Sequence, residues 1–205
     1  MTEIKVTKVN HMGNDFTVAD AARVSFAKQA KNYSPEQNRK LIQYLAKHKH
    51  ISPFGHCFAT FHVKAPVFVA RQLVKHKFLR WNEVSRRYVD DEPEFYVPDV
   101  WRGRSADKKQ GSDGEMPCPV RPEMLYKDAI DSYTTMLESG VCPEQARMVL
   151  PQSMMTEWYW SGSLDAFADM CNLRCKEDTQ YESRVVANAI SKEMSWLFPI
   201  SWSSL

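Results

Sequence analysis

The stretch between residues 52 and 66 is the feature that most limits what this chain can fold into. Residues 52–55 read Ser-Pro-Phe-Gly, which predicts a turn. Residues 57–64 then alternate, with apolar side chains at the odd positions and mostly polar ones at the even positions. This pattern predicts a strand with one buried face, and Pro66 favours the start of a helix directly after it. A half-buried strand that leads into a helix fits a sheet flanked by helices.

The other segments alternate between the same two kinds of element. Strand patterns occur at residues 4–9 and at residues 152–160, the second of which is rich in aromatic residues and Met. Helices are predicted at residues 18–26, 35–47, 66–78, 122–137, 143–149, 164–173 and 181–197. Residues 102–120 are the best loop candidate. The order lacks the rhythm of a doubly wound fold. We therefore expect one α+β domain over residues 1–205, with a mixed, largely antiparallel sheet flanked by helices.

Composition is that of an ordinary globular protein. Of the 205 residues, 43% are hydrophobic and 25% are charged. The formal net charge is only +2, so any nucleic-acid or anion site has to be local. No apolar run approaches about 18 residues, and the first residues lack an apolar signal core. We expect no membrane partner, and a location in the cytoplasm or in the cytoplasm of a host cell.

Cysteine and histidine give no sign of cross-links or metal. The five cysteines are irregularly spaced, which argues against a disulfide framework. Cys171 and Cys175 are four residues apart and could share a helix face, but there is no second pair, so we interpret them as structural thiols. The histidines that lie close in sequence fall on a helix end, a turn and a strand, and we expect no metal site. These histidines are His48, His50, His56 and His62.

Positive charge is concentrated in residues 71–87. This stretch holds six Lys or Arg residues and one His against a single acid, Glu83. Arg71 and Lys75 are one turn apart on the helix predicted for residues 66–78, so we expect them to project together. Such a field suits a phosphate or pyrophosphate, and the alternative is a solvated helix face. Interleaved polar hydrogen-bonding residues and the aromatic segment that follows favour the anion site. No Gly-rich phosphate loop is present, so side chains would have to hold a nucleotide.

The order of residues in this stretch resembles the signature of flavin-dependent thymidylate synthases. That signature is Arg-His-Arg, seven residues, Ser, and then x-Arg-Tyr. Here it reads Lys-His-Lys at 75–77, Ser85, and Arg-Tyr at 87–88. Other blocks are similar to the same family in the same order, at residues 21–26, 50–56, 61–72, 146–151 and 172–174. The resemblance therefore covers most of the chain.

The resemblance implies an enzyme that makes dTMP from dUMP. Methylenetetrahydrofolate would supply the one-carbon unit, and FAD reduced by NADPH would supply reducing equivalents. The enzyme would be a homotetramer with active sites shared between subunits. The residues that would hold dUMP are Gln72, Lys75, Glu83, Ser85, Arg86, Arg87, Arg147 and Arg174. Those that would contact FAD are Ser52, Lys75, His76, Lys77 and Glu83.

These implied roles make chemical sense. Arg87 and Arg147 could clamp the phosphate dianion with forked hydrogen bonds, and Ser85 would add a neutral donor. Arg174 would be the catalytic residue, stabilising negative charge on the uracil ring as C5 becomes nucleophilic. The alternative for Arg174 is an ion pair with Glu177 or Asp178.

The chain departs from the family pattern in its cofactor residues. The two arginines of the signature are Lys75 and Lys77 here, which keep the charge but lose the planar fork, so we expect weaker flavin binding. Positions at which the family has polar or basic flavin contacts are here Ser163, Asp165 and Asp169. The two acids would repel a pyrophosphate.

Two competing hypotheses follow from the same residues. One is a nucleic-acid-binding module that stacks bases on Phe78, Trp81 and Tyr88, which the near-neutral net charge disfavours. The other is a relative that keeps the fold without the catalytic activity.

Overall fold

The computed structural model describes residues 2–106 and 111–205. Its helices are α1 (Asp15–Arg23), α2 (Pro35–Lys47), α3 (Val67–Leu73), α4 (Pro122–Glu138), α5 (Pro143–Ala146), α6 (Leu164–Arg174), α7 (Tyr181–Leu197) and α8 (Pro199–Ser204). Its strands are β1 (Lys5–Met12), β2 (Phe58–Pro66), β3 (Arg80–Glu83), β4 (Arg102–Arg104), β5 (Ser112–Glu115) and β6 (Met155–Ser163). Short 3-10 helices are η1 (Val24–Phe26), η2 (Ala30–Asn32), η3 (Ser52–His56) and η4 (Arg147–Val149).

Four strands form an antiparallel sheet in the order β1-β2-β6-β3. The central pair, β2 and β6, is matched over its whole length, from Phe58 opposite Ser163 to Pro66 opposite Met155. β4 and β5 make a separate antiparallel ribbon. The expected mixed fold with an antiparallel sheet is confirmed.

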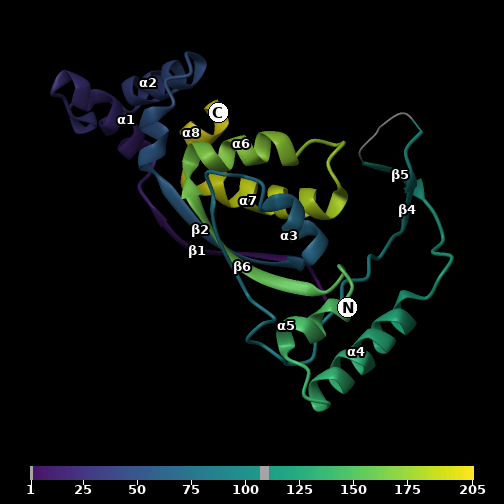
Figure 1. The fold of residues 1–205 in the computed structure, drawn as a ribbon. Coiled ribbons are helices and arrows are strands. Elements are labelled where there is room, and N and C mark those ends of the chain that lie inside the picture. The colour runs from purple at the N-terminus through teal and green to yellow at the C-terminus, as the bar shows by residue number, and fades with distance from the viewer. Residues whose placement is uncertain (1, 107–110) are drawn as a thin grey trace.

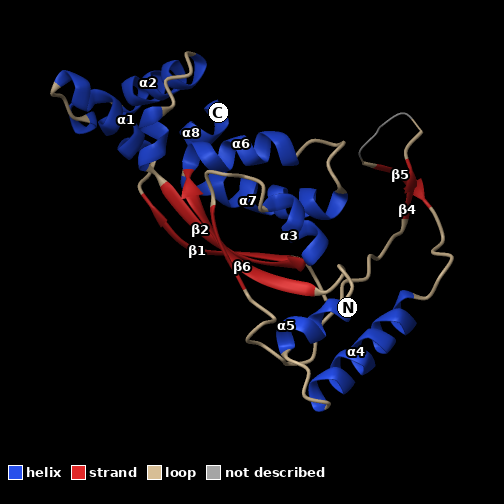
Figure 2. Cartoon of the chain, viewed as in Figure 1, coloured by secondary structure: helices blue, strands red, loops and turns tan. Residues whose placement is uncertain are grey.

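The helices are distributed unequally around the sheet (Figure 1). α3, α6 and α7 lie across one face, and α1 and α2 project from one end. α4 and α5 lie on the other side of the sheet, and the β4–β5 ribbon stands apart from it (Figure 2). In the described part of the chain, no helix is long and apolar enough to cross a membrane.

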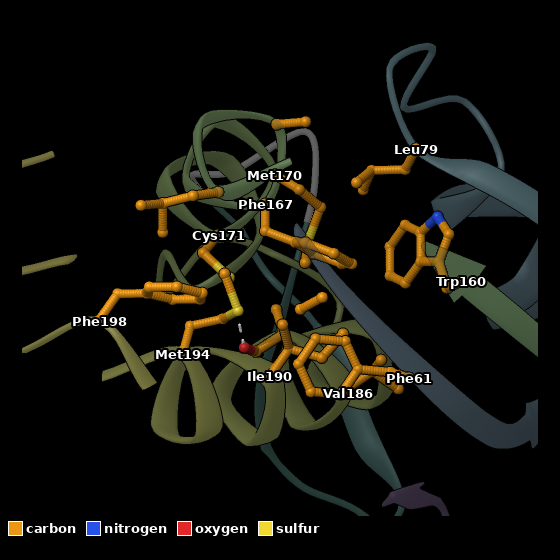
Figure 3. Close-up of a cluster of buried hydrophobic side chains, with 14 of the residues drawn as sticks. Phe61, Leu79, Trp160, Phe167, Met170, Cys171, Val186, Ile190, Met194 and Phe198 are labelled. Atoms are coloured by element: carbon orange, nitrogen blue, oxygen red, sulfur yellow. Dashed lines mark hydrogen bonds between the residues drawn. The ribbon is translucent and has the colours of Figure 1, made fainter. Parts of the chain in front are cut away.

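The hydrophobic core lies between the sheet and the α6–α7 layer (Figure 3). Phe61 of β2 and Phe167 of α6 meet edge to face, with ring centroids 5.2 Å apart, and both are fully buried. Burial at odd positions along β2 follows the alternation read from the sequence. The Cys171 thiol donates to the main-chain oxygen of Ala187 at 3.6 Å, which ties α6 to α7. All five cysteines are free thiols.

Helix ends follow local chemistry. The Ser34 side chain accepts from the main-chain N–H of Gln37, and the Gln37 side chain accepts from the N–H of Ser34, so α2 begins at Pro35 with a capping box. α4 ends before Gly140, whose φ of 85° is costly for residues with a side chain. Both ends agree with the predicted boundaries.

Several boundaries differ from those predicted. The helix expected at 18–26 begins earlier, at Asp15, because Asn14 caps it. The segment 102–120 is not only loop, because it contains β4 and β5; its residues 107–110 lie outside the described part. The sequence pattern missed β3 and α8, which are only four and six residues long.

Candidate functional site

The basic stretch 71–87 adopts three different structures. α3 ends at Leu73, a turn follows, and β3 pairs with β6 at the edge of the sheet. The predicted helix over 66–78 is therefore too long: Phe78 is 80% exposed, and Lys75 lies beyond the helix that carries Arg71. The physical reason is that residues from Arg80 onward gain ladder hydrogen bonds and a packed partner surface on β6, which a continued helix would forgo.

Glu83 is fixed by its neighbours on the sheet. Its carboxylate accepts from the Thr156 hydroxyl at 2.9 Å and from the Trp81 indole N–H at 3.0 Å. Trp81 in turn stacks on Trp158, with ring centroids 4.3 Å apart. One face of the Trp81 ring is therefore covered by Trp158, which removes one of the three stacking groups that a nucleic-acid site would need.

The loop after β3 holds the remaining signature residues. Arg86 donates to the main-chain oxygen and to the carboxylate of Asp91, and its side chain is only 12% exposed. The Ser85 hydroxyl accepts from Arg87 Nε at 3.1 Å, and the Arg87 guanidinium lies 4.9 Å from the centre of the Tyr88 ring. Arg86 is thus engaged within its own loop, whereas Ser85 and Arg87 form a pair at the surface.

A cavity of about 920 Å³ opens beside this loop. It brings together Glu83, Arg86 and Arg147, three of the predicted dUMP residues, with Arg71. Arg147 comes from η4, where its Nε donates to the main-chain oxygen of Glu144 at 3.2 Å. The cavity wall also carries carboxylates, namely Asp91, Glu92, Glu94, Glu144 and Glu157.

A second cavity, of about 760 Å³, contains two more of the predicted dUMP residues. Gln72 of α3 and Arg174, the last residue of α6, both line it. Aromatic side chains make up much of its wall: Phe68, Tyr96, Trp101 and Tyr126. This cavity therefore combines a cation, an amide and apolar ring surfaces, as a site for a planar polar ring requires.

Arg174 is held by neutral acceptors. Its Nε donates to His76 Nε2 at 3.1 Å, and its Nη2 donates to the main-chain oxygen of Gln72 at 3.4 Å. Among the described residues it forms no ion pair with Glu177 or Asp178, so that alternative is not supported. Burial lowers the pKa of Arg174, and burial together with the Arg174 charge lowers the pKa of His76. His76 is therefore neutral at pH 7, with Nε2 as the acceptor.

The predicted flavin residues lie on separate segments, namely η3, the turn after α3, and β3. Ser52 begins η3, which packs against α6, and Lys75 and Lys77 are exposed in the turn. The two ammonium groups of the turn suit a diphosphate-bearing dinucleotide. Asp165 in the first turn of α6 does not, and its buried Oδ1 has no hydrogen-bond partner among the described residues. The residues present thus fit an anionic cofactor at the turn and not at the α6 carboxylates.

One chain does not bring all predicted residues together. Three dUMP residues line the first cavity and two line the second, while Lys75, Ser85 and Arg87 line neither. Gln180 was not predicted as a site residue. Its side-chain oxygen accepts a hydrogen bond from Gln72 Nε2, but the two residues are 108 positions apart and no sequence motif surrounds Gln180. Within the described ranges, no group of three or more His, Cys, Asp or Glu could hold a metal ion.

Comparison with known proteins shows which family this chain is similar to. The family model described as thymidylate synthase complementing protein matches residues 8–200. A flavin-dependent thymidylate synthase of Thermus thermophilus is 38% identical over 202 residues, covering 97% of this chain and 74% of the relative. One from Kosmotoga olearia is 39% identical over 214 residues, covering 98% and 92%.

A solved structure supports the same assignment. The UMP/dUMP methylase PolB of Streptomyces cacaoi, solved with 5-Br dUMP bound, is 31% identical, with a TM-score of 0.87 over 100% of this chain and 95% of that one. Over nearly its whole length the chain is similar to the flavin-dependent thymidylate synthases above, and it belongs to the thymidylate synthase complementing protein family.

Proposed function

We propose that this enzyme carries out the reductive methylation of dUMP to dTMP. The one-carbon unit would come from methylenetetrahydrofolate, and NADPH would reduce an FAD cofactor. Family membership and the relatives' names support the flavin-dependent reaction. The observation that carries the proposal is the position of Arg174 in the wall of an aromatic-lined cavity. Hydrogen bonds to His76 and to the main-chain oxygen of Gln72 fix its guanidinium there.

The substrate roles fall on residues of both cavities and of the loop after β3. Arg147, with Arg87 and Ser85 from the loop after β3, would bind the phosphate dianion. Arg174 would donate to a uracil carbonyl and stabilise negative charge on the ring as C5 attacks the one-carbon unit. Partial burial strengthens this contact, because water screens the guanidinium less than it would at an exposed position. The wider dUMP set would be completed by Gln72, Lys75, Glu83 and Arg86.

The cofactor roles fall on the turn after α3. Lys75 and Lys77 would face the anionic part of FAD, with Ser52, His76 and Glu83 around it. When bound, FAD supplies the redox chemistry of the reaction, and the chain supplies its position and electrostatic surroundings. Because Lys makes single rather than forked contacts, we expect weaker FAD binding than an Arg pair would give.

We also propose that the functional unit is a homotetramer in the cytoplasm. The split of the predicted dUMP residues between two cavities favours active sites completed by a second subunit. The five free thiols suit a reducing compartment.

The direct test is incubation of the protein with dUMP, methylenetetrahydrofolate, NADPH and FAD, followed by chromatographic assay for dTMP. A folded, FAD-loaded protein that makes no dTMP would contradict the proposal. A yellow protein with flavin absorbance would also separate it from a colourless nucleic-acid-binding module.

Arg174→Ala refines this test. Loss of a charged donor at the reacting ring should lower kcat by about 100-fold or more, while FAD stays bound. Arg39→Ala, which removes an exposed arginine of α2, is the matched control and should leave kcat unchanged. Equal kcat values for Arg174→Ala and wild type would show that the guanidinium has no catalytic role.

A further inference from the structure

A buried carboxylate next to the second cavity sets the direction of two amide side chains. Glu182, in the first turn of α7, is only 4% exposed and forms an ion pair with Arg102 of β4. Its second oxygen accepts from Gln180 Nε2 at 3.2 Å. The Arg102 side chain also donates to Ser112 at 3.0 Å, so the pair joins the β4–β5 ribbon to α7.

The direction of the Gln180 amide follows from chemistry. A carboxylate paired with a guanidinium only accepts hydrogen bonds, so the nitrogen of Gln180 has to face Glu182. The oxygen of Gln180 then faces Gln72, and it accepts from Gln72 Nε2 at 2.9 Å. Reversing Gln180 would place oxygen against oxygen at Glu182 and nitrogen against nitrogen at Gln72. The assignment of amide oxygen and nitrogen, which is often ambiguous, is therefore determined here.

The chain of amides ends at an acceptor without a partner. Gln72 Oε1 is buried in the wall of the second cavity and accepts no hydrogen bond from any described residue. Arg174 lines the same cavity, and its Nη2 donates to the main-chain oxygen of Gln72 at 3.4 Å. This wall thus combines an amide acceptor with guanidinium donors.

We infer that Glu182, acting through Gln180, makes the second cavity selective for a uracil ring over a cytosine ring. The inference rests on the proposed function, which places the pyrimidine beside Gln72 and Arg174. Uracil carries a donor, N3–H, next to an acceptor, the C4 carbonyl. Cytosine carries the reverse pattern, an acceptor at N3 next to an amino donor. With the amide direction fixed, uracil satisfies both groups of the wall, whereas cytosine meets acceptor with acceptor and donor with donor.

Glu182→Gln tests this inference in the full chain with FAD added. Because the Arg102 guanidinium only donates, a Gln at position 182 would turn its oxygen toward Arg102 and its nitrogen toward Gln180, so the Gln180 and Gln72 amides would no longer be held in the direction that suits uracil. Titration calorimetry with dUMP and with dCMP isolates the ring, because the two nucleotides share sugar and phosphate. We expect the ratio of the dCMP Kd to the dUMP Kd to fall about tenfold, the effect of one misdirected hydrogen bond.

Two further variants complete the design. Gln180→Met keeps the Arg102–Glu182 pair but interrupts the relay, and it should lower the Kd ratio equally; it carries the test if Glu182→Gln does not fold. Glu36→Gln removes a carboxylate from an exposed ion-pair group on α2 and should leave the ratio unchanged.

The outcomes separate the relay from the proposed function. An unchanged ratio in a folded relay variant, including equal weakening of both nucleotides, overturns the inference and assigns Glu182 a purely structural role. A wild-type protein that binds neither nucleotide overturns the proposed function itself. A fall in the ratio for both relay variants, with the control unchanged, supports the inference.

Discussion

The charge state of His76 depends on its contact with Arg174. The hydrogen bond from Arg174 Nε uses the lone pair on His76 Nε2, which exists only in the neutral imidazole. Burial and the Arg174 charge lower the pKa of His76 below its usual value of about 6.5. Protonation would remove the acceptor and place two cations in contact.

A pH dependence follows from this pair. The unfolded chain binds a proton at His76 near pH 6.5, and the folded chain does so only at lower pH. The stability that neutral His76 supports is therefore present above about pH 6.5 and is lost as pH falls through the lowered folded pKa. dUMP binding should weaken over the same range, because Arg174 loses its orientation.

His76→Gln should shift that pH profile, because the Gln oxygen accepts from Arg174 without titrating. We expect dUMP affinity, measured by calorimetry between pH 5 and 8, to fall less at acid pH in this variant than in wild type, and the loss that remains is the titration of the dUMP phosphate, whose second pKa is about 6. His56→Gln, at an exposed histidine, is the control and should retain the acid loss of the wild type. Parallel profiles for wild type and His76→Gln would exclude the pair as the pH-sensitive element.

The double variant Lys75→Arg, Lys77→Arg tests the cofactor side of the site. Both lysines are exposed in the turn after α3, so a longer side chain meets no packing obstacle. Forked contacts should tighten FAD binding by about tenfold, measured by flavin fluorescence titration. Lys47→Arg at the end of α2 is the control. Equal FAD affinity in the double variant and wild type would argue against contact between these lysines and the cofactor.

At the scale of elements, the sequence predicted those that begin or end on a local signal. Ser34 with Pro35 marks the start of α2, and Gly140 marks the end of α4, because caps and left-handed residues act within one turn of the chain. β3 was missed because its stability comes from pairing with β6, nearly 80 residues further on. The extension of α3 to residue 78 was wrong for the same reason.

The α2 cap gives an element-scale prediction. Ser34→Ala removes the acceptor for the Gln37 N–H at 3.2 Å and should lower the free energy of unfolding by about 1 kcal/mol. Urea denaturation followed by circular dichroism measures it. Ser195→Ala, within α7, keeps the helix interior intact and should change the free energy much less. A comparable loss in both variants would mean that the cap contributes nothing specific.

At the scale of the whole molecule, the family blocks in the sequence predict which residues belong to the site but not which of them line the same cavity. Arg147 and Arg174 each match a block in sequence, yet they line different cavities. No sequence pattern reports which cavity a residue enters, because that depends on where α6 and η4 pack. The contact between Arg102 and Glu182 could not be predicted, because it joins a segment predicted as loop to a helix 80 positions away.

Subunit mixing tests whether the two cavities of different chains form one site. Arg147→Ala and Arg174→Ala should each be inactive alone. Refolded together in equal amounts, they should recover about a quarter of wild-type dTMP synthesis. If a site takes Arg147 from one chain and Arg174 from another, both arginines are present in about a quarter of the sites formed by random pairing. Mixing each variant with itself is the control. No recovery in mixed oligomers of confirmed mass would place both arginines of a site on one chain.

The stacked indoles at the sheet edge have a practical consequence. Trp81 and Trp158 are 4.3 Å apart, Trp160 lies within 5.7 Å of Trp81, and the strand that carries Trp81 leads directly into the Ser85–Arg87 loop. Indole emission overlaps flavin absorption, so excitation energy would pass from this trio to a nearby isoalloxazine. If FAD binds at this edge of the sheet as proposed, the loss of tryptophan emission on cofactor binding would report cofactor occupancy without any attached label.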